Sequence, residues 1–518
     1  MRDSPADLSP DEFRVAGKAL VDRVADFLAT IRDQPVAPDT TPAAVRARLG
    51  ADAPVPRVGA PAGEVLQHAA DVLLSGSTLN GHPRFLGYIT SSASPIGALA
   101  DMLAASLNAN CGAWALSPVA TEIERQTVRW VAELIGFPTD SGGIMVSGGN
   151  VANLVCFIAA TRDRAQADLR AHGVNSAGRM LVYASSEVHT WLEKTADMCG
   201  LGLDAVRSVP VDGGLAMRTD ALREQIARDR RDGFRPAIVV GTAGSVGTAA
   251  IDPLRELSAI AKENDLWFHV DGAYGAPAAM LPDSPADLRA LALADSVAVD
   301  PHKWLYAPLE AGCALVRRPS ALHDAFSFHP PYFTFDGQAE DPPTNFYEWG
   351  PQNSRGFRAL KVWTTIQQVG REGYQRMIAD DIALSREMHR LASGEAELEA
   401  LTQALSINTF RYIPLGLDRK AVGAKEYLNE LNTALLARVQ AEGTAYLSNA
   451  LIDGNFALRA CIVNFRTTSA DVRATIDVIV RLGRVMDAEM RPAGLRGPIR
   501  VEEAVNGLTA RQPDSSTA

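Results

Sequence analysis

Short apolar runs in the middle of the chain alternate with stretches that have the spacing of helices. Seven of these runs are expected to be buried strands, and they lie at 144–146, 181–183, 206–211, 238–242, 266–270, 296–299 and 313–316. Helical patterns separate most of them, as at 151–162, 220–230 and 253–263. Apolar strands that alternate with helices are typical of a mostly parallel sheet covered on both faces. The pattern therefore predicts an α/β fold.

An amphipathic segment precedes this central region. Residues 10–31 place apolar side chains on one face of a predicted helix. A proline-rich stretch over 35–61 follows, with a short helical pattern at 41–49. Such a segment cannot form a core of its own. We therefore expect an N-terminal helical arm that wraps a neighbouring lobe or a partner subunit, which favours a homodimer.

The C-terminal part shows a different pattern. After a long helical stretch that begins at Phe357, strand-like runs at 405–412 and 457–465 flank a helical pattern over 424–442. This arrangement predicts a smaller α+β domain. The expected parts of the chain are an arm over 1–95, a large domain over 96–375, a small domain over 376–490 and a tail over 491–518.

Composition narrows the classes of function. The chain has 518 residues, of which 47% are hydrophobic, and its net charge of −11 argues against nucleic acid as a partner. No apolar stretch is long enough to span a membrane and no signal peptide follows Met1, so we expect a cytoplasmic protein without a membrane partner. The cysteines lack metal-ligand spacing and are expected to be thiols in a reducing compartment; they are Cys111, Cys156, Cys199, Cys313 and Cys461.

Two charged residues follow neighbouring apolar runs. Lys303 comes after the run at 296–299 with His302 beside it, and Asp271 comes after the run at 266–270. Burial disfavours an ammonium and lowers its pKa, which would make the Lys303 amine nucleophilic near neutral pH. An isolated lysine at a strand end could instead extend its ammonium to water. A lysine for a Schiff base and an aspartate for a pyridinium nitrogen are, however, the pair that pyridoxal phosphate (PLP) requires.

Three further features lie at predicted strand ends, where ligands bind in open parallel sheets. Gly142–Asn150 is rich in glycine and opens a helix, which suits a phosphate, although a plain strand–turn–helix junction has the same pattern. His189 could stack on a flat ring, or it could be a cap or surface residue. The segment 242–247 offers small residues that leave room for a ligand, or is simply a loop. We interpret His269 as a core or supporting histidine.

The order of these motifs resembles a known family. Ser147-Gly148-Gly149-Asn150, His189, His269-Val270-Asp271-Gly272-Ala273-Tyr274 and Asp300-Pro301-His302-Lys303-Trp304 look like segments of the group II PLP-dependent decarboxylases. The closest resemblance is to the aromatic-L-amino-acid decarboxylases, and it runs from about Phe13 to about Arg484. It implies PLP fold type I, as in aspartate aminotransferase, and a homodimer. It also implies conversion of an L-amino acid, with an aromatic one favoured, to the amine and carbon dioxide.

The resemblance also implies roles for single residues. Lys303 would bind PLP covalently, Asp271 would pair with the pyridine nitrogen, and His189 and Ala273 would enclose the ring. The other residues expected around the cofactor are Gly149, Asn150, Thr242 and His302. Tyr332, in a segment expected to be a mobile loop, matches the tyrosine that protonates the substrate carbon. Candidates for the substrate pocket are the aromatic residues Phe85, Tyr88 and Trp114.

Three features depart from the family pattern: Asp300, Asn150 in place of the usual small hydroxyl residue, and the loop after Tyr332, which does not match the animal enzymes well. Asp300 stands where the aromatic branch has asparagine, and an anion near a phosphate is unfavourable unless a neighbour compensates.

Three alternatives remain open. The alternatives that keep PLP are an aldehyde synthase and a decarboxylase of a non-aromatic amino acid. A metal-dependent hydrolase using His269, Asp271 and His302 would leave Lys303 and the glycine-rich loop unexplained, so we expect no metal.

Overall fold

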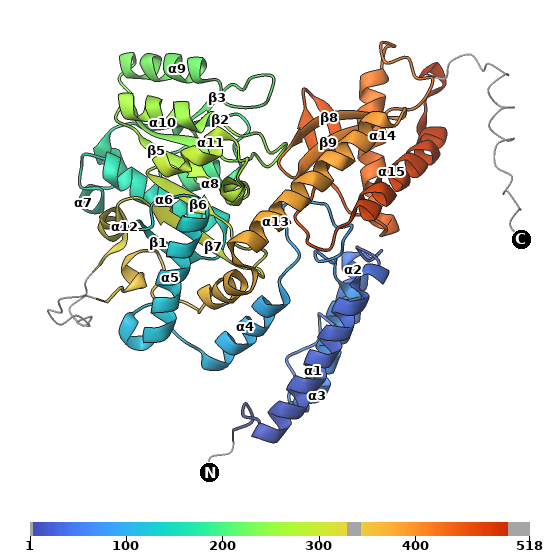
Figure 1. The fold of residues 1–518 in the computed structure, drawn as a ribbon, viewed down its shortest axis with the longest axis horizontal. Helices are drawn as coiled ribbons and strands as arrows, with labels where there is room; N and C mark the ends of the chain where they lie inside the picture. Colours follow the sequence, from blue (N-terminus) through green and yellow to red (C-terminus); the bar gives the residue numbers. More distant parts are fainter. Residues whose placement is uncertain (1–3, 329–342, 496–518) are drawn as a thin grey trace, which may run out of the picture.

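The computed structural model describes residues 4–328 and 343–495 of the chain. Two lobes lie side by side, and a helical arm extends away from them near the N-terminus (Figure 1). The larger lobe is built on a seven-stranded sheet and the smaller one on a four-stranded sheet.

The large sheet follows the predicted alternation. Its strands are β1 Gly142–Val146, β2 Met180–Ser185, β3 Val206–Val209, β4 Arg235–Thr242, β5 Trp267–Asp271, β6 Ser296–Val299 and β7 Gly312–Val316. They lie in the order β1-β7-β6-β5-β4-β2-β3, and only β7 runs against its neighbours. The mostly parallel α/β sheet expected from the sequence is confirmed. The carboxyl ends of β1, β4, β5 and β6 therefore meet at one edge.

Helices cover both faces of this sheet. Those on one face include α5 Pro118–Leu134, α9 Thr219–Arg231 and α10 Leu254–Glu263, and those on the other include α6 Gly149–Arg164, α8 Trp191–Met198 and α12 Pro319–Phe326. Successive strand residues alternate between the two cores, as Trp267 and Phe268 do on β5. Burial on both faces explains why the strands are apolar throughout.

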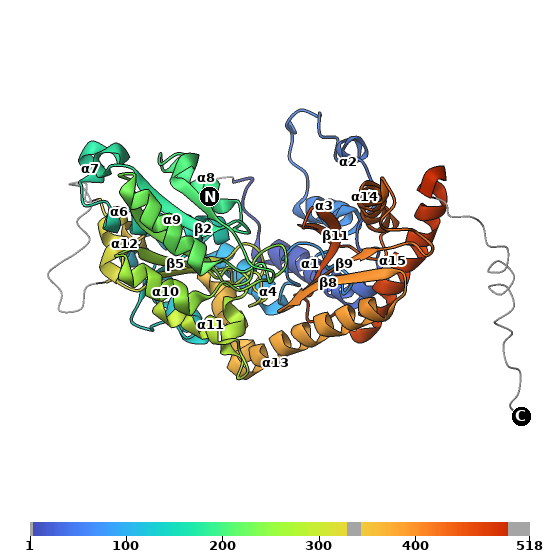
Figure 2. The ribbon, with the colours of Figure 1, turned by 90° about the horizontal axis from the view of Figure 1, so that it is seen from above.

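A long helix connects the lobes. α13 spans Ala359–Gly394, with a break at Gly370 where φ is 66°, and it runs from the large lobe into the small one (Figure 2). The small antiparallel sheet contains β8 Leu398–Ala404, β9 Ile407–Tyr412, β10 Ser448–Ile452 and β11 Asn455–Cys461, which pack with α14 Ala424–Glu442 and α15 Ser469–Met490. The expected α+β domain is present, and the boundaries between the four expected parts of the chain stay predictions.

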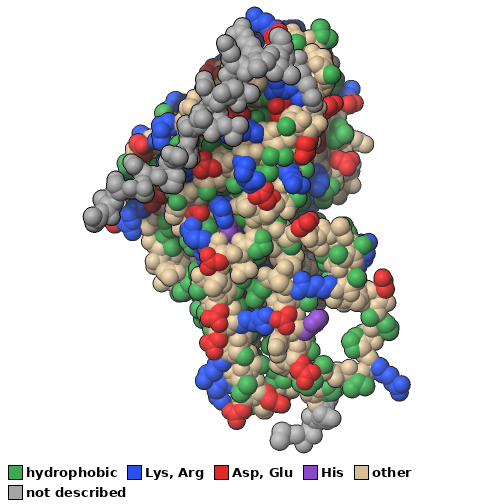
Figure 3. Space-filling view, turned by 90° about the vertical axis from the view of Figure 1, so that its right-hand side faces the viewer, with side chains coloured by type: hydrophobic (Ala, Val, Ile, Leu, Met, Phe, Trp, Pro, Cys, Tyr) green, Lys and Arg blue, Asp and Glu red, His purple; other side chains and the backbone are tan. Residues whose placement is uncertain are grey.

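The arm exposes apolar side chains. It contains α1 Pro10–Thr30, α2 Pro42–Leu49 and α3 Ala62–Gly76, and α4 Pro95–Leu107 follows it. Ser9 and Glu12 cap the start of α1 reciprocally, yet no residue of α1 is buried. In the lower part of Figure 3, hydrophobic side chains of the arm lie at the surface among charged ones.

Candidate active site

A cavity of about 560 Å³ lies at the carboxyl edge of the large sheet, where the two lobes and the segment after the arm meet. Its lining comes from five strand-end or loop segments of the large lobe, from the segment after the arm and from the small-lobe strands β10 and β11. The lining residues are Tyr88–Thr90, Ser147–Val151, Asn153, His189, Trp191, Thr242, Gly244, Val246, Gly247, Asp271, Ala273, Tyr274, Asp300, His302, Lys303, Ser448, Asn449 and Arg459. Most of the polar residues predicted from the sequence therefore meet at one place.

The Asp271 carboxylate is held in a fixed orientation at the end of β5. Its Oδ2 accepts a hydrogen bond from Trp191 Nε1 at 2.7 Å, and its Oδ1 accepts one from the Ala273 backbone N–H at 3.1 Å. The residue is only 8% exposed and lines the cavity. A carboxylate in this position can stabilise a positive charge on a ligand.

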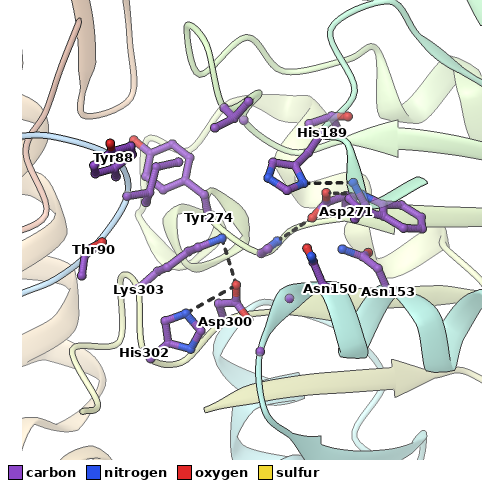
Figure 4. Close-up of a pocket in the computed structure, with 18 of the residues that line it drawn as sticks. Tyr88, Thr90, Asn150, Asn153, His189, Asp271, Tyr274, Asp300, His302 and Lys303 are labelled. Atoms are coloured by element: carbon purple, nitrogen blue, oxygen red, sulfur yellow. Dashed lines mark hydrogen bonds and ion pairs between the residues drawn. The ribbon is translucent and has the colours of Figure 1, made fainter. Parts of the chain in front are cut away.

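Lys303 lies in the loop that follows β6, and β6 pairs with β5, the strand that ends at Asp271. Its Nζ is 2.9 Å from Asp300 Oδ2 (Figure 4). Burial acts to lower the pKa of Lys303, but the charge and hydrogen bond of Asp300, with Asp271 behind it, outweigh burial and raise that pKa. The expectation that burial would leave the pKa of Lys303 lowered is therefore wrong, because the sequence did not reveal this ion pair.

Asp300 is the most enclosed charged residue of this group. It is 1% exposed, and its Oδ2 also lies 3.8 Å from His302 Nε2. Its Oδ1 is buried and has no hydrogen-bond partner among the described residues. Asp300 thus faces Lys303 on one side and leaves an unsatisfied oxygen on the other.

Two histidines of the site are neutral near pH 7. His189 projects into the cavity near Asp271, and its Nδ1 accepts the Trp191 backbone N–H at 3.2 Å (Figure 4). Burial lowers the pKa of His189, and burial likewise lowers the pKa of His302. A neutral, nearly flat ring at the position of His189 is suited to stack on a planar ligand.

His269 has no free nitrogen to offer. Its ring nitrogens lie 2.8 Å from Ser296 Oγ and 2.7 Å from Asn153 Oδ1, and burial lowers its pKa to about 4. Within residues 4–328 and 343–495, no group of three or more His, Cys, Asp or Glu side chains is arranged to hold a metal ion. The metal-hydrolase alternative therefore lacks its first ligand, because both ring nitrogens of His269 are engaged in the core.

The glycine-rich loop approaches the Lys303 segment closely. Gly148 caps α6, and a Cβ atom on Gly149 would lie 2.6 Å from Asp300 Oδ2. A Cβ on Gly312, the first residue of β7, would lie 2.6 Å from the Gly148 backbone. Glycine is required at these contacts. The residues at the start of α6 line the cavity, and a helix N-terminus suits a phosphate.

These groups fit PLP. The cavity offers a primary amine at Lys303, a carboxylate at Asp271 and the start of α6 for an anion. The other predicted cofactor residues also line the cavity: Asn150, Thr242, Ala273 and His302. Thr242 lies directly beside Asp271 in the sheet register. Asp300 is the one group that opposes a phosphate, because it brings a second negative charge.

Only one of the three predicted substrate-pocket residues lines the cavity. Tyr88 lines the cavity and is 58% exposed. Phe85 is instead buried against Tyr446, with ring centroids 5.0 Å apart, and it is not among the lining residues. Trp114 lies outside the cavity, where its Nε1 donates to Glu122 at 3.2 Å. Tyr332 lies outside the described residues.

Arg459 and Tyr274 are two of the lining residues that were not predicted as site residues from the sequence. Arg459 is 2% exposed and donates to the carbonyl oxygens of Gly247 and Tyr88 at 3.2 and 3.1 Å. An arginine inside the apolar run at 457–465 was the signal that could have revealed it. The other residue, Tyr274, stacks on Trp304 with centroids 4.9 Å apart.

Comparison with known proteins identifies the class. Residues 42–412 match the pyridoxal-dependent decarboxylase conserved domain. The chain is 31% identical to an aromatic-L-amino-acid decarboxylase of Bacillus atrophaeus over 90% of this chain and 94% of that one. It is 28% identical to a phenylacetaldehyde synthase of a Rosa hybrid cultivar, over 88% and 90% of the two chains.

A solved structure agrees with the fold. The Oryza sativa TDC with PLP and tryptamine superposes with a TM-score of 0.85 at 25% identity, covering 94% of this chain and all of that one. The chain therefore belongs to the pyridoxal-dependent decarboxylase family. It is a PLP-dependent amino acid decarboxylase of fold type I, as the motifs predicted. Among the helices described, none is long and apolar enough to cross a membrane.

Proposed function

We propose that this decarboxylase converts an aromatic L-amino acid to its amine and carbon dioxide. The observation that carries the proposal is the pairing of the Asp271 carboxylate and the Lys303 amine in one cavity, at neighbouring strand ends. An aromatic substrate is favoured by Tyr88 at the cavity wall, by the name of the Bacillus atrophaeus relative and by the tryptamine in the Oryza sativa structure.

Each lining residue has a role in this proposal. Lys303 supplies the amine that binds the cofactor, and Asp271 keeps the positive charge on its pyridine nitrogen. Bound PLP would supply the electron acceptor for the breaking bond to the carboxylate. His189 covers the ring face and excludes water, and the Ser147–Asn150 loop with His302 binds the phosphate. Thr242 and Ala273, which line the cavity, would also contact the cofactor.

Arg459 is a positioning residue in this scheme. Its hydrogen bonds to Gly247 and Tyr88 join the small lobe to two walls of the cavity, and Ser448 Oγ accepts a further bond at 3.0 Å. The guanidinium is buried, so its loss would leave these carbonyl groups unsatisfied. Arg459→Lys should therefore raise KM more than it lowers kcat.

The test of the substrate is a panel of L-amino acids assayed for carbon dioxide release. We expect the highest kcat/KM with tyrosine, tryptophan, phenylalanine or their hydroxylated forms. A preference for glutamate or another non-aromatic amino acid would overturn the aromatic proposal but leave the decarboxylase class intact.

Lys303→Ala should abolish turnover and the covalent link to PLP. Borohydride reduction that labels a different lysine would overturn the assignment of Lys303.

The product is the second part of the proposal. The phenylacetaldehyde synthase among the relatives favours aldehyde formation as the alternative to an amine. We propose Tyr332 as the group that protonates the substrate carbon. Tyr332→Phe should still release carbon dioxide but divert product from amine toward aldehyde in air, because the carbanion then survives long enough to meet dioxygen. An unchanged amine yield and rate would mean that another group supplies the proton.

The arm supports a homodimer. A hollow of about 750 Å³ between α1 and α3 is lined by apolar residues that include Val15, Ala19 and Leu66, and a second subunit could cover it. Sedimentation should give a dimer, and Val15→Arg should weaken it. Val422→Arg, at a 99% exposed position outside the arm, is the matched control. A fully active wild-type monomer would remove this proposal.

The cytoplasm is the proposed location. All five cysteines are free thiols, and a reducing compartment keeps thiols in this state. Cell fractionation tests the location, and recovery of the active protein from outside the cytoplasm would contradict it.

A further inference from the structure

The proposed decarboxylation gives no role to Asp300, although this residue lies in the active-site cavity. Its carboxylate is 1% exposed, 2.9 Å from Lys303 Nζ, and beside the glycine loop that suits a phosphate. A buried carboxylate normally needs partners for both oxygens. Here one oxygen contacts Lys303 and the other has no partner among the described residues.

The surroundings leave Asp300 as the dominant charge on Lys303. His189 and His302 face the lysine from two loops, and burial lowers the pKa of each, so both are neutral near pH 7. Cys461 of β11 is also near, and burial raises the pKa of its thiol to about 11, so it is neutral too. The other anion, Asp271, is already engaged by Trp191.

We propose that Asp300 is a positioning residue that gates cofactor capture: in the cofactor-free chain it holds Lys303 as an ammonium, and this pair must transfer a proton before the amine can react. The inference rests on the proposal that Lys303 binds PLP covalently. It concerns loading of the protein, which is a separate event from turnover.

The chemistry of capture balances within this pair. Nζ of Lys303 would lose one proton to Asp300 Oδ2 and its other two protons to the aldehyde oxygen, which leaves as water. A C=N bond replaces the C=O bond, with no net transfer of electrons. The transfer also converts Asp300 to a neutral carboxyl group. That removes the negative charge beside Gly149, where an arriving phosphate would otherwise meet it. One proton transfer therefore frees the Lys303 amine to react and removes the negative charge that would repel the phosphate.

The gate makes a directional prediction. Asp300→Asn keeps the size of the side chain but removes the anion, so burial becomes the main influence on Lys303 and lowers its pKa. A larger fraction of the lysine is then a free amine at neutral pH. Capture of an aldehyde at pH 7.5 should speed up by about tenfold or more, which corresponds to a shift of about one pH unit in the rate profile.

The experiment measures capture, not turnover. The full-length chain is freed of cofactor with hydroxylamine and mixed with pyridoxal or with PLP. Borohydride stops the reaction at set times, and peptide mass spectrometry counts the label on Lys303. Pyridoxal isolates the effect on the amine, because it carries no phosphate. With PLP the gain in Asp300→Asn should be larger than with pyridoxal, since the variant also removes repulsion of the phosphate.

Two variants serve as controls. Asp300→Glu keeps the charge and should leave capture slow at pH 7.5. Asp101→Asn breaks a second lysine–aspartate pair, in which Lys361 Nζ lies 3.0 Å from Asp101 Oδ2 outside the cavity, and should not change labelling of Lys303. Far-UV circular dichroism checks that each variant is folded.

The outcomes separate the two proposals. Capture that is unchanged or slower in folded Asp300→Asn would overturn the gate while Lys303 remains the labelled residue. Label on another lysine would instead overturn the cofactor assignment. Should Asp300→Asn fail to fold, the wild-type profile decides alone. Its capture rate must still rise with pH above about pH 9, and a plateau below about pH 8 would overturn the gate.

Discussion

Two buried aspartates of this protein each accept a hydrogen bond from a tryptophan indole N–H, but their roles differ. Trp191 Nε1 donates to Asp271 Oδ2 at 2.7 Å, and Trp304 Nε1 donates to Asp381 Oδ2 at 2.8 Å. Asp271 lines the cavity, whereas Asp381, on α13, is 2% exposed and lies behind the Lys303 segment in the core.

The difference lies in what surrounds each carboxylate. Tyr306 OH also donates to Asp381, and burial raises the pKa of that residue to about 7. Asp381 therefore joins α13 to the segment after Lys303 and has no access to a ligand. Asp271 is oriented by Trp191 while facing open space. A buried carboxylate becomes a cofactor partner only where the fold leaves a cavity beside it.

The largest effect that tests this comparison is loss of activity in Asp271→Asn. An amide cannot hold the positive charge of a pyridinium nitrogen, so we expect kcat/KM to fall by about 100-fold or more. The variant should stay folded with a modestly lower melting temperature, because the amide keeps only one acceptor for the N–H groups of Trp191 and Ala273. Near-wild-type decarboxylation would show that Asp271 is structural.

The same substitution in the core should act on stability. Trp304 Nε1 and Tyr306 OH both donate to Asp381 Oδ2. Asp381→Asn weakens this acceptor and replaces the other carboxylate oxygen with an NH2 group, so the free energy of unfolding should fall by about 1–3 kcal/mol. Activity per folded molecule should stay within about threefold of wild type. Urea denaturation and steady-state assays measure both quantities. A loss of activity without a loss of stability would erase the distinction between the two aspartates.

The stability difference should also depend on pH. The pKa of Asp381 in the folded protein, about 7, lies above that of an unfolded aspartate, so folding favours its protonated form. Its contribution is complete below the unfolded pKa and is lost as pH rises through about 7. The deficit of Asp381→Asn should thus be largest near pH 5 and smallest near pH 8. A deficit that grows with pH would contradict the raised pKa.

The smallest effects concern the two tryptophans. Trp191→Phe removes a hydrogen bond from the cavity aspartate, so activity should fall by about tenfold. Trp304→Phe removes the equivalent bond from Asp381 and should cost about 1 kcal/mol of stability with activity nearly unchanged. The activities of the two variants are measured in the same assay. If both lose activity equally, the two indoles act only through packing.

Much of the site could be predicted from the order of residues along the chain. Asp271, Lys303 and the Ser147–Asn150 loop follow apolar runs, and the ends of parallel strands share one edge of a sheet. His189 was found for the same reason. These features are local in sequence, because hydrophobic period and glycine content set where a strand stops. They sufficed for the α/β fold, whereas the decarboxylase class came from the resemblance of the ordered motifs to a known family.

Only the tertiary structure decided which side chains touch. The Lys303–Asp300 ion pair reversed the direction expected for the pKa of the lysine, because the direction of a side chain is invisible in a sequence. Phe85 and Trp114 fitted the expected chemistry but lie away from the cavity, whereas Arg459 reaches it from the small lobe. The contacts of Arg459 and Phe85 join residues more than two hundred positions apart, and packing between lobes, not local pattern, determines them.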